Sequence, residues 1–223
     1  PRLRRWTTHQ ASGYDRGGGF YDSGNFLRTE PDRRHVLMEC EGPGVIDRLW
    51  FTYKGEYGAE PYDLLVYLDD TDRPAIAANL DDLFAGQREP FVEPLAGRCG
   101  APKTPGRYSY VPLGFARSAK IVLRPTAPPG QYKYRENSRG ERIPHIYYQV
   151  TYRRLPPGTA VRPFSRQLDP VERDALVRWQ ELAGRPGDSP WPGVQPMIAH
   201  TVECDLEPSQ TVQLAERAAP GVI

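Results

Sequence analysis

Two apolar, β-prone runs that meet at the tripeptide Gly42-Pro43-Gly44 limit most strongly how this chain can fold. Neither a strand nor a helix is expected to run through this tripeptide, because proline lacks the N–H that a ladder needs and glycine weakens element interiors. The run after it alternates between two sets of side chains: Val45, Leu49, Phe51 and Tyr53 in one, and Ile46, Arg48, Trp50 and Thr52 in the other. Such alternation is typical of a strand with one face in a core. Over residues 35–53 we therefore predict a strand, a tight corner and a second strand.

Turn-forming residues are frequent along the whole chain. The 223 residues include 21 glycines and 24 prolines, which is above average usage but below that of unstructured low-complexity chains. Further β-prone runs occur at residues 62–69, 108–113, 119–124 and 145–153, and the links between them are rich in Gly and Pro. We therefore predict an all-β fold, a β-sandwich with long loops.

The charge balance argues against two classes of partner. The chain has 29 basic and 28 acidic residues, a net charge of +1, so no general attraction to nucleic acid or to an anionic membrane is expected. No apolar run approaches the roughly 18 residues of a membrane-spanning helix. We expect neither nucleic acid nor a membrane as a partner.

A glycine-rich run at residues 12–25 (SGYDRGGGFYDSGN) is the first candidate for a binding site. It places Asp15, Arg16 and Asp22 among three aromatic residues, Tyr14, Phe20 and Tyr21. Carboxylates that accept hydroxyl hydrogen bonds, beside rings that stack on apolar sugar faces, are typical of a carbohydrate site. A phosphate cradle is a second interpretation, although the GK[ST] ending of a P-loop is missing. A plain surface loop is the third.

Clustered carboxylates and cysteines offer further candidates. Residues 69–72 and the pair Asp81-Asp82 suit a Ca²⁺ site or acid–base chemistry, but we favour turns and caps, because Asp bonds nearby backbone N–H groups. We expect no metal and no cofactor.

The three cysteines, Cys40, Cys99 and Cys204, fit no zinc spacing. They are interpreted as buried free thiols, with one disulfide and a leftover thiol as the alternative.

One helix is predicted at residues 170–183. Asp169 is a natural N-cap, Pro170 suits the first helical position, and Glu172 completes a capping box. Gly184 ends the helix. One face carries the apolar residues Val171, Ala175, Leu176, Trp179 and Leu182. This face is expected to dock on the preceding β domain, and a linker (RPGDSPWPGVQP) follows the helix.

The end of the chain repeats its beginning. When Ile223 is aligned with Ile46, Leu214 matches Leu37, Glu216 matches Glu39, and Pro220-Gly-Val-Ile223 matches Pro43-Gly-Val-Ile46. A second β unit is therefore expected to begin near the C-terminus. The predicted organisation is an N-terminal sandwich at 1–160, a helix and linker at 161–205, and the opening strand or strands of a second, incomplete unit at 206–223. An unpaired apolar strand invites a partner strand, which is expected from a second half or another chain.

Six segments in order resemble glycoside hydrolase family 172 (domain-of-unknown-function family 2961). They are the loop at 12–27, GPGVIDRLWFTY, LLVYLDDTDRPAI, DDLFAG, YSYVPLGFARSAKIVL and YYQVTY. The resemblance covers Arg5 to Tyr152. It implies tandem β-jelly-rolls in bacterial proteins that act on α-D-arabinofuranosides or α-D-fructofuranosides with retention, assembled as trimers or hexamers.

The resemblance assigns no catalytic residue to this chain. The family's glutamates lie in W-x-EGD and GTGTEDY motifs, neither of which occurs here, so the catalytic residues are expected outside these 223 residues. The loop departs from the family's DRTGGN pattern and loses its Asn, while Asp15, Arg16 and Asp22 remain candidate sugar-binding residues. Trp50 is a fourth candidate, as a stacking platform, with a core or interface aromatic as its alternative. A non-catalytic carbohydrate-binding or assembly module is the alternative function, and a secreted or periplasmic location is favoured over the cytoplasm.

Overall fold

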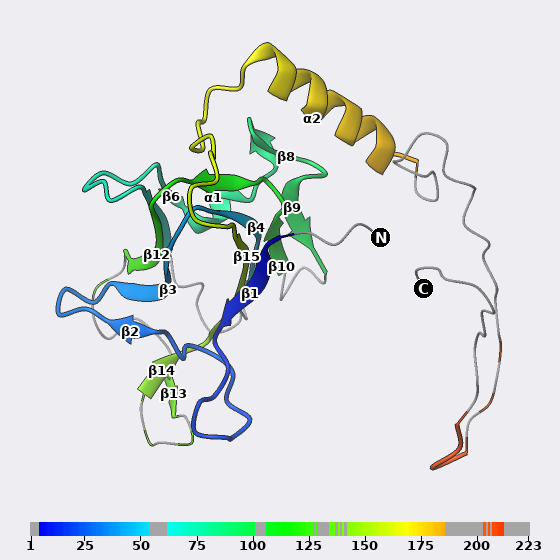
Figure 1. The fold of residues 1–223 in the computed structure, drawn as a ribbon. Helices are drawn as coiled ribbons and strands as arrows, with labels where there is room; N and C mark the ends of the chain where they lie inside the picture. Colours follow the sequence, from blue (N-terminus) through cyan, green and yellow to red (C-terminus); the bar gives the residue numbers. More distant parts are fainter. Residues whose placement is uncertain are drawn as a thin grey trace.

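Two antiparallel sheets packed face to face form the body of the protein (Figure 1). The computed structural model describes residues 5–53, 62–100, 106–126, 128, 134–136, 138, 140, 142–185, 203, 205 and 207–211. The first sheet, sheet A, has the order β1 (Thr7–Ser12), β15 (Ile146–Arg154), β4 (Gly44–Tyr53), β10 (Gly106–Ser109) and β9 (Ala96–Cys99), with β11 (Leu113–Phe115) also paired to β4. The second, sheet B, has the order β2 (Arg28–Thr29), β3 (His35–Glu41), β12 (Ser118–Pro125), β5 (Tyr62–Leu68) and β6 (Ile76–Asn79).

The strand pairs nest inside one another along the sequence. β1 pairs with β15, β3 with β12, β4 with β10, and β5 with β6, alternately in sheet A and sheet B. This is a long antiparallel ribbon rolled into two sheets, which is the jelly-roll arrangement. The predicted all-β fold, a β-jelly-roll sandwich, is therefore confirmed.

Short elements complete the described chain. The hairpins are β7 (Gln87–Arg88) with β8 (Phe91–Val92), and β13 (Tyr134–Glu136) with β14 (Arg142–Pro144). The helices are α1 (Leu80–Leu83) and α2 (Pro170–Ala183). The described residues contain no helix long and apolar enough to cross a membrane.

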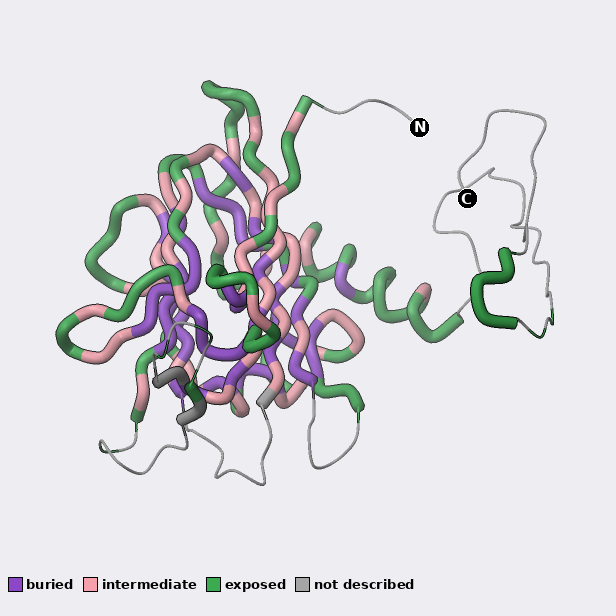
Figure 2. The backbone as a smooth tube through the Cα atoms, turned by 90° about the horizontal axis from the view of Figure 1, so that it is seen from below, coloured by how far each residue is buried: buried purple, intermediate pink, exposed green. Residues whose placement is uncertain are grey.

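The core fills the space between the two sheets (Figure 2). Every second residue of a sheet strand faces inward, and in β5 these are Tyr62, Leu64, Val66 and Leu68, all at most 5% exposed. Large buried side chains of sheet A meet them, among them Leu49, Phe51 and Tyr148. The strand predicted at 62–69 is thus confirmed, as are those at 119–124 and 145–153.

The predicted corner between β3 and β4 is also confirmed, and its glycines have a steric reason. The ring of Phe115 packs against this corner. A Cβ added to Gly42 or to Gly44 would lie 2.4 Å from a carbon of that ring. Only glycine leaves room for the buried Phe115 at these two positions.

The predicted alternation in β4 is wrong at one point. Ile46 is fully buried together with Leu49 and Phe51, although it belongs to the opposite parity. The pairing with β15 shifts register there: Thr151 is opposite Arg48, but Tyr152 is opposite Ile46. The extra residue is Asp47, and such a β-bulge exchanges the two faces of a strand.

The strand predicted at residues 108–113 is interrupted. β10 ends at Ser109 and β11 begins at Leu113. Between them Pro112 cannot donate a ladder hydrogen bond, and the Val111 N–H bonds instead to the Ser109 hydroxyl at 3.1 Å. The chain therefore leaves β10 and rejoins β4 further along.

Helix α2 begins and ends as predicted. Asp169 Oδ1 accepts from the Glu172 N–H at 2.8 Å, and Glu172 Oε2 accepts from the Asp169 N–H at 2.9 Å. The predicted apolar face is correct only in part, because Leu176 alone is buried while Val171 is 75% exposed. The helix lies beside the sandwich, where Gln180 Nε2 donates to the Glu93 carbonyl oxygen at 2.8 Å.

Asp69 and Asp70 form a turn, as predicted, whereas the N-cap of α1 is Asn79 and not one of the aspartates. Asp69 and Asp70 both have a φ of 60°, and the Asp69 carboxylate accepts from the Ala116 and Arg117 N–H groups at 2.7 Å. Asp81 and Asp82 lie in the first turn of α1. Within the described ranges, no three His, Cys, Asp or Glu side chains are grouped to hold a metal ion.

Two sequence predictions fall partly outside the described residues. Cys40 is a partly buried free thiol and Cys99 an exposed one, so burial of the thiols is wrong for Cys99; Cys204 lies outside the described residues. The second β unit at 206–223 stays a prediction, since only 207–211 of it are described.

Candidate functional site

The glycine-rich loop between β1 and β2 projects from one end of the sandwich (the blue loop in Figure 1). Its base is tied to sheet A: the Gly13 N–H donates to the Tyr148 carbonyl oxygen at 3.3 Å, and the Gly24 N–H donates to that of Ile146 at 2.7 Å. Gly18 has a φ of 81°, a left-handed conformation that side chains resist. The loop is therefore a defined turn on a fixed base.

Asn25 holds the two arms of the loop together. Its buried side-chain amide donates to the carbonyl oxygens of Gly13 at 3.1 Å, Tyr21 at 2.5 Å and Ser23 at 3.3 Å. The Tyr148 hydroxyl donates to the Asn25 carbonyl oxygen at 3.1 Å. Burial raises the pKa of Tyr148 to about 12, with Arg16 acting in the opposite direction. The hydroxyl thus keeps its proton and its role as donor.

Asp15 is turned into the loop. It is only 5% exposed, and its Oδ1 accepts from the Ser138 hydroxyl at 2.8 Å and from the Gly17 N–H at 2.9 Å. The Ser138 hydrogen bond is the main reason why the pKa of Asp15 lies below its ordinary value. Asp15 therefore links the glycine-rich loop to the segment between β13 and β14.

Arg16 and Asp22 lie in the same loop and are exposed to solvent. Arg16 Nη1 donates to the Asn25 carbonyl oxygen at 2.9 Å, and its guanidinium lies 4.5 Å from the centre of the Tyr14 ring. Asp22 Oδ1 accepts from the Asp15 N–H at 2.9 Å. Each side chain has an internal contact that fixes it, and each reaches solvent where a ligand can meet it.

Three aromatic residues of the loop are exposed. Phe20 is 98% exposed, Tyr14 54% and Tyr21 39%. An isolated exposed apolar side chain needs no explanation, but several on one small, internally bonded loop indicate a contact surface.

Trp50 lies apart from the other three candidates. It is half-buried in β4, opposite Gln149 of β15 and Tyr108 of β10. A Cβ added to Gly106 would lie 3.3 Å from Trp50 Nε1, so the indole extends along β10. The loop leaves β1 at Ser12, which is opposite Gln149, so Trp50 is two strands away. The structure brings Asp15, Arg16 and Asp22 together and leaves Trp50 on the outer face of sheet A.

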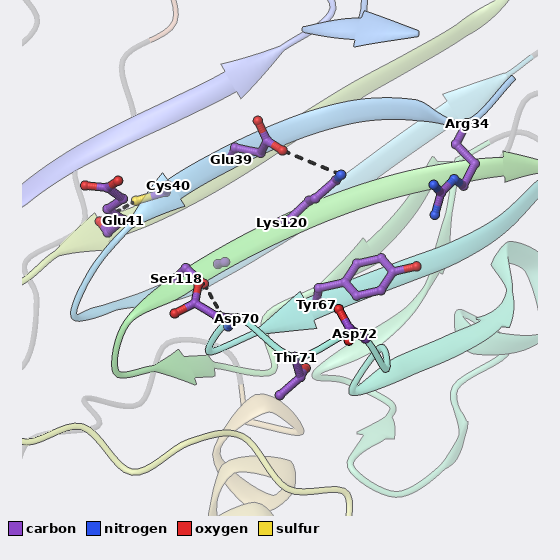
Figure 3. A pocket seen from close by; sticks show the side chains of 11 residues that line it. Arg34, Glu39, Cys40, Glu41, Tyr67, Asp70, Thr71, Asp72, Ser118 and Lys120 are labelled. Atoms are coloured by element: carbon purple, nitrogen blue, oxygen red, sulfur yellow. Dashed lines mark hydrogen bonds and ion pairs between the residues drawn. The ribbon is translucent and has the colours of Figure 1, made fainter. Parts of the chain in front are cut away.

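A second candidate is a polar groove on the outer face of sheet B (Figure 3). It has a volume of about 660 Å³ and crosses β3, β12 and β5 to the turn after β5. The Tyr67 ring lies in its middle, with Arg34 and Asp72 on either side, and Glu39 is paired with Lys120 (Figure 3). Sequence reasoning missed this groove because each strand supplies only one or two outward polar residues.

Two glutamates at this groove, Glu39 in its lining and Glu30 beside it, are held in ion pairs. Glu39 pairs with Arg28 at 2.5 Å, and Glu30 pairs with Lys120 at 2.8 Å. These two hydrogen bonds are the main reasons why the pKa values of Glu39 and Glu30 lie below the ordinary value. A glycosidase acid needs a raised pKa, so this pair suits binding better than proton transfer.

Sequence reasoning also did not identify the partners that build the loop. Asn25 lies in the glycine-rich run, but nothing local showed that its amide joins three carbonyl groups. Tyr148 was recognised only as part of the β-prone run at 145–153, and Ser138 lies 123 residues from Asp15. The loop lacks the Asn of the family's DRTGGN pattern, but it has an anchoring amide, that of Asn25.

The strand order of the two sheets defines the class of protein: a jelly-roll β-sandwich. Residues 4–171 match the family model described as the GH172 first beta-sandwich domain. The chain therefore belongs to glycoside hydrolase family 172, and it contains that family's first β-sandwich domain. A comparison with curated proteins gave no match.

Proposed function

We propose that this chain is the N-terminal, sugar-contacting part of a retaining glycosidase for α-D-arabinofuranoside or α-D-fructofuranoside linkages. Membership of glycoside hydrolase family 172 supports the reaction class. The observation that carries a sugar-contacting role is the internally bonded loop, which holds Arg16 and Asp22 at the surface beside exposed aromatic rings. Asp22 would accept sugar hydroxyl hydrogen bonds, Arg16 would donate to sugar oxygens, and Asp15 would hold the loop in place.

The catalytic pair is proposed to lie outside this chain. Retention requires a nucleophile and an acid/base carboxyl about 5 Å apart, with the acid's pKa raised. In the described part of the chain, each carboxyl with a clearly displaced pKa, namely Asp15, Glu30, Glu39 and Asp169, is displaced downward. Neither glutamate motif of the family occurs in the sequence. A second jelly-roll, in the same polypeptide or in another chain, would supply the two glutamates.

The test of the reaction is turnover by the protein at its full natural length. Aryl α-D-arabinofuranoside and aryl α-D-fructofuranoside are the substrates, and proton NMR of the first-formed sugar reports its anomeric configuration. The proposal expects hydrolysis of at least one substrate with the α anomer formed first. An initially β product, or hydrolysis only of pyranosides, would contradict the proposed linkage and stereochemistry.

The alternative function is a non-catalytic carbohydrate-binding or assembly module. The ion-paired glutamates Glu39 and Glu30 at the groove of sheet B favour this alternative. They provide charged groups for binding but no protonated carboxyl that could act as the catalytic acid. Sugar binding by the full-length protein without turnover of any furanoside would support this alternative over the enzyme.

A further inference from the structure

A small pocket lies where β15 ends, and its described lining carries two arginines, Arg5 and Arg154, but no carboxylate. Its volume is about 370 Å³, which is within the range of pockets that enclose small ligands. The start of β1, the corner between β3 and β4 and the segment that follows β15 form its walls. The uncharged side chains of these walls include Trp6, Thr7, Pro43, Leu155, Pro156 and Pro157.

The two arginines of this pocket carry charges that the described chain does not neutralise. Within the described residues, neither the Arg5 nor the Arg154 guanidinium has an ion pair or a hydrogen bond, and both residues are exposed. Glu41 precedes the corner in the sequence, but it lines the groove of sheet B instead. Two such guanidinium groups are suited to bind an anion, because each offers several charge-assisted hydrogen bonds.

Trp6 gives the pocket an aromatic wall that is held in place. The guanidinium of Arg153 lies 4.7 Å from the centre of the Trp6 ring. The same guanidinium donates to both carboxylate oxygens of Asp47, at 2.6 and 2.7 Å. The bulge at Asp47 therefore orients the arginine that packs on the indole. Across the pocket, the Leu155 N–H donates to the Pro43 carbonyl oxygen at 2.9 Å and ties the proline-rich wall to the corner.

We infer that this pocket binds an acidic sugar, that is, a sugar ring carrying a carboxylate or a phosphate group. Arg5 and Arg154 would bind the anionic group, and Trp6 would pack against the apolar face of the ring. The small volume and the net charge of only +1 favour a small anion over nucleic acid or an anionic membrane. Membership of a glycoside hydrolase family supports a sugar as the body of that anion.

The pocket is separate from the glycine-rich loop. The loop is bonded to β15 at Ile146 and Tyr148, near the start of that strand, whereas Arg154 is its last residue. The two sites therefore lie at opposite ends of β15, and the pocket uses none of the side chains proposed to contact a furanoside. The inference goes beyond the proposed function and can fail without it.

The first test is calorimetric titration of the protein at its full natural length. The ligands are glucuronate, galacturonate and glucose 6-phosphate, with glucose, acetate and inorganic phosphate as controls. At least one acidic sugar should bind about 10-fold or more tightly than every control, because only an acidic sugar provides both the charge and the ring. Absence of binding by all three acidic sugars, or equal affinity for glucose, would overturn the inference. Equal affinity for acetate or inorganic phosphate would overturn the assignment to a sugar.

The second test locates the bound sugar. Arg5→Gln and Arg154→Gln should each weaken binding of the acidic sugar by about 10-fold, because each change removes a charged donor. Arg178→Gln is the matched control, since Arg178 is an exposed arginine of α2 outside the pocket lining, and it should bind like the wild type. Asp22→Ala should also leave this affinity unchanged. Unchanged affinity in both pocket variants, an equal loss in Arg178→Gln, or a loss confined to Asp22→Ala would overturn the inference.

Discussion

The Tyr148 hydroxyl donates a hydrogen bond to the Asn25 carbonyl oxygen at 3.1 Å and so joins the core of the sandwich to the candidate sugar-binding loop. Tyr148 is 1% exposed and Asn25 3%. The Asn25 amide then holds three carbonyl groups of the loop. The surface positions of Arg16 and Asp22 therefore depend on a buried tyrosine.

Replacing Tyr148 by Phe should loosen the loop without unfolding the domain. The change removes one buried hydrogen bond and leaves the Asn25 carbonyl without that donor, a loss of about 1–2 kcal/mol in the free energy of unfolding. Hydrogen exchange should quicken at residues 13–25 more than in β5. Tyr110→Phe, which alters a 49% exposed tyrosine, is the control. Equal exchange in wild type and Tyr148→Phe would show that the hydroxyl does not hold the loop.

Replacing Gly44 by Ala should destabilise the protein strongly. The new Cβ would lie 2.4 Å from a ring carbon of Phe115 and 2.6 Å from the Arg153 carbonyl oxygen. Overpacking of this kind costs about 1–3 kcal/mol or more. Gly184→Ala is the matched control, since its Cβ would have no neighbour closer than 3.5 Å. Urea denaturation should show a lower midpoint for Gly44→Ala alone, and similar midpoints for both would refute the packing account of the corner.

His35 should make stability depend on pH in the mildly acidic range. Burial, with a smaller contribution from the charge of Arg33, lowers the pKa of His35 from 6.5 to about 4. Between these values the unfolded chain binds a proton that the folded chain excludes. The contribution of the neutral, buried His35 to the free energy of unfolding is therefore complete above pH 6.5. It is lost as the pH falls towards 4, and the total loss is about 3 kcal/mol.

The measurement for His35 is the free energy of unfolding at several pH values. His35→Phe should remove this part of the slope. Thr29→Val, which deletes only the hydrogen-bond partner of the ring at 2.9 Å, should keep it. A slope of wild-type size in His35→Phe would assign the titration to other groups.

The sequence predicted those parts of the fold that depend on local chemistry. The capping box needs only Asp169 and Glu172, three residues apart, and it formed as expected. Alternation located β5, β12 and β15, because each has one face in the core. The β-bulge at Asp47 could not be predicted in this way, because a bulge is defined by the pairing of two strands rather than by the pattern of one strand.

The sequence could predict that the candidate site lies in a loop, but it could not predict the role of each residue there. Glycines and mixed aromatic and charged residues marked residues 12–25 as a contact surface. Burial of Asp15 depends on Ser138, 123 residues away, and no local pattern links the two. The same holds for the groove of sheet B, where Tyr67 and Lys120 meet only after the strands pair.

Titration of methyl α-D-arabinofuranoside and methyl α-D-fructofuranoside tests most directly whether sugar is bound at the glycine-rich loop. Asp22→Ala should weaken binding by about 1–3 kcal/mol. Asp22→Asn, which keeps an oxygen for the Asp15 N–H, should lose less, and Asp72→Ala in the groove of sheet B should bind like the wild type. Unchanged affinity in Asp22→Ala, or a loss in Asp72→Ala alone, would contradict a sugar site on this loop.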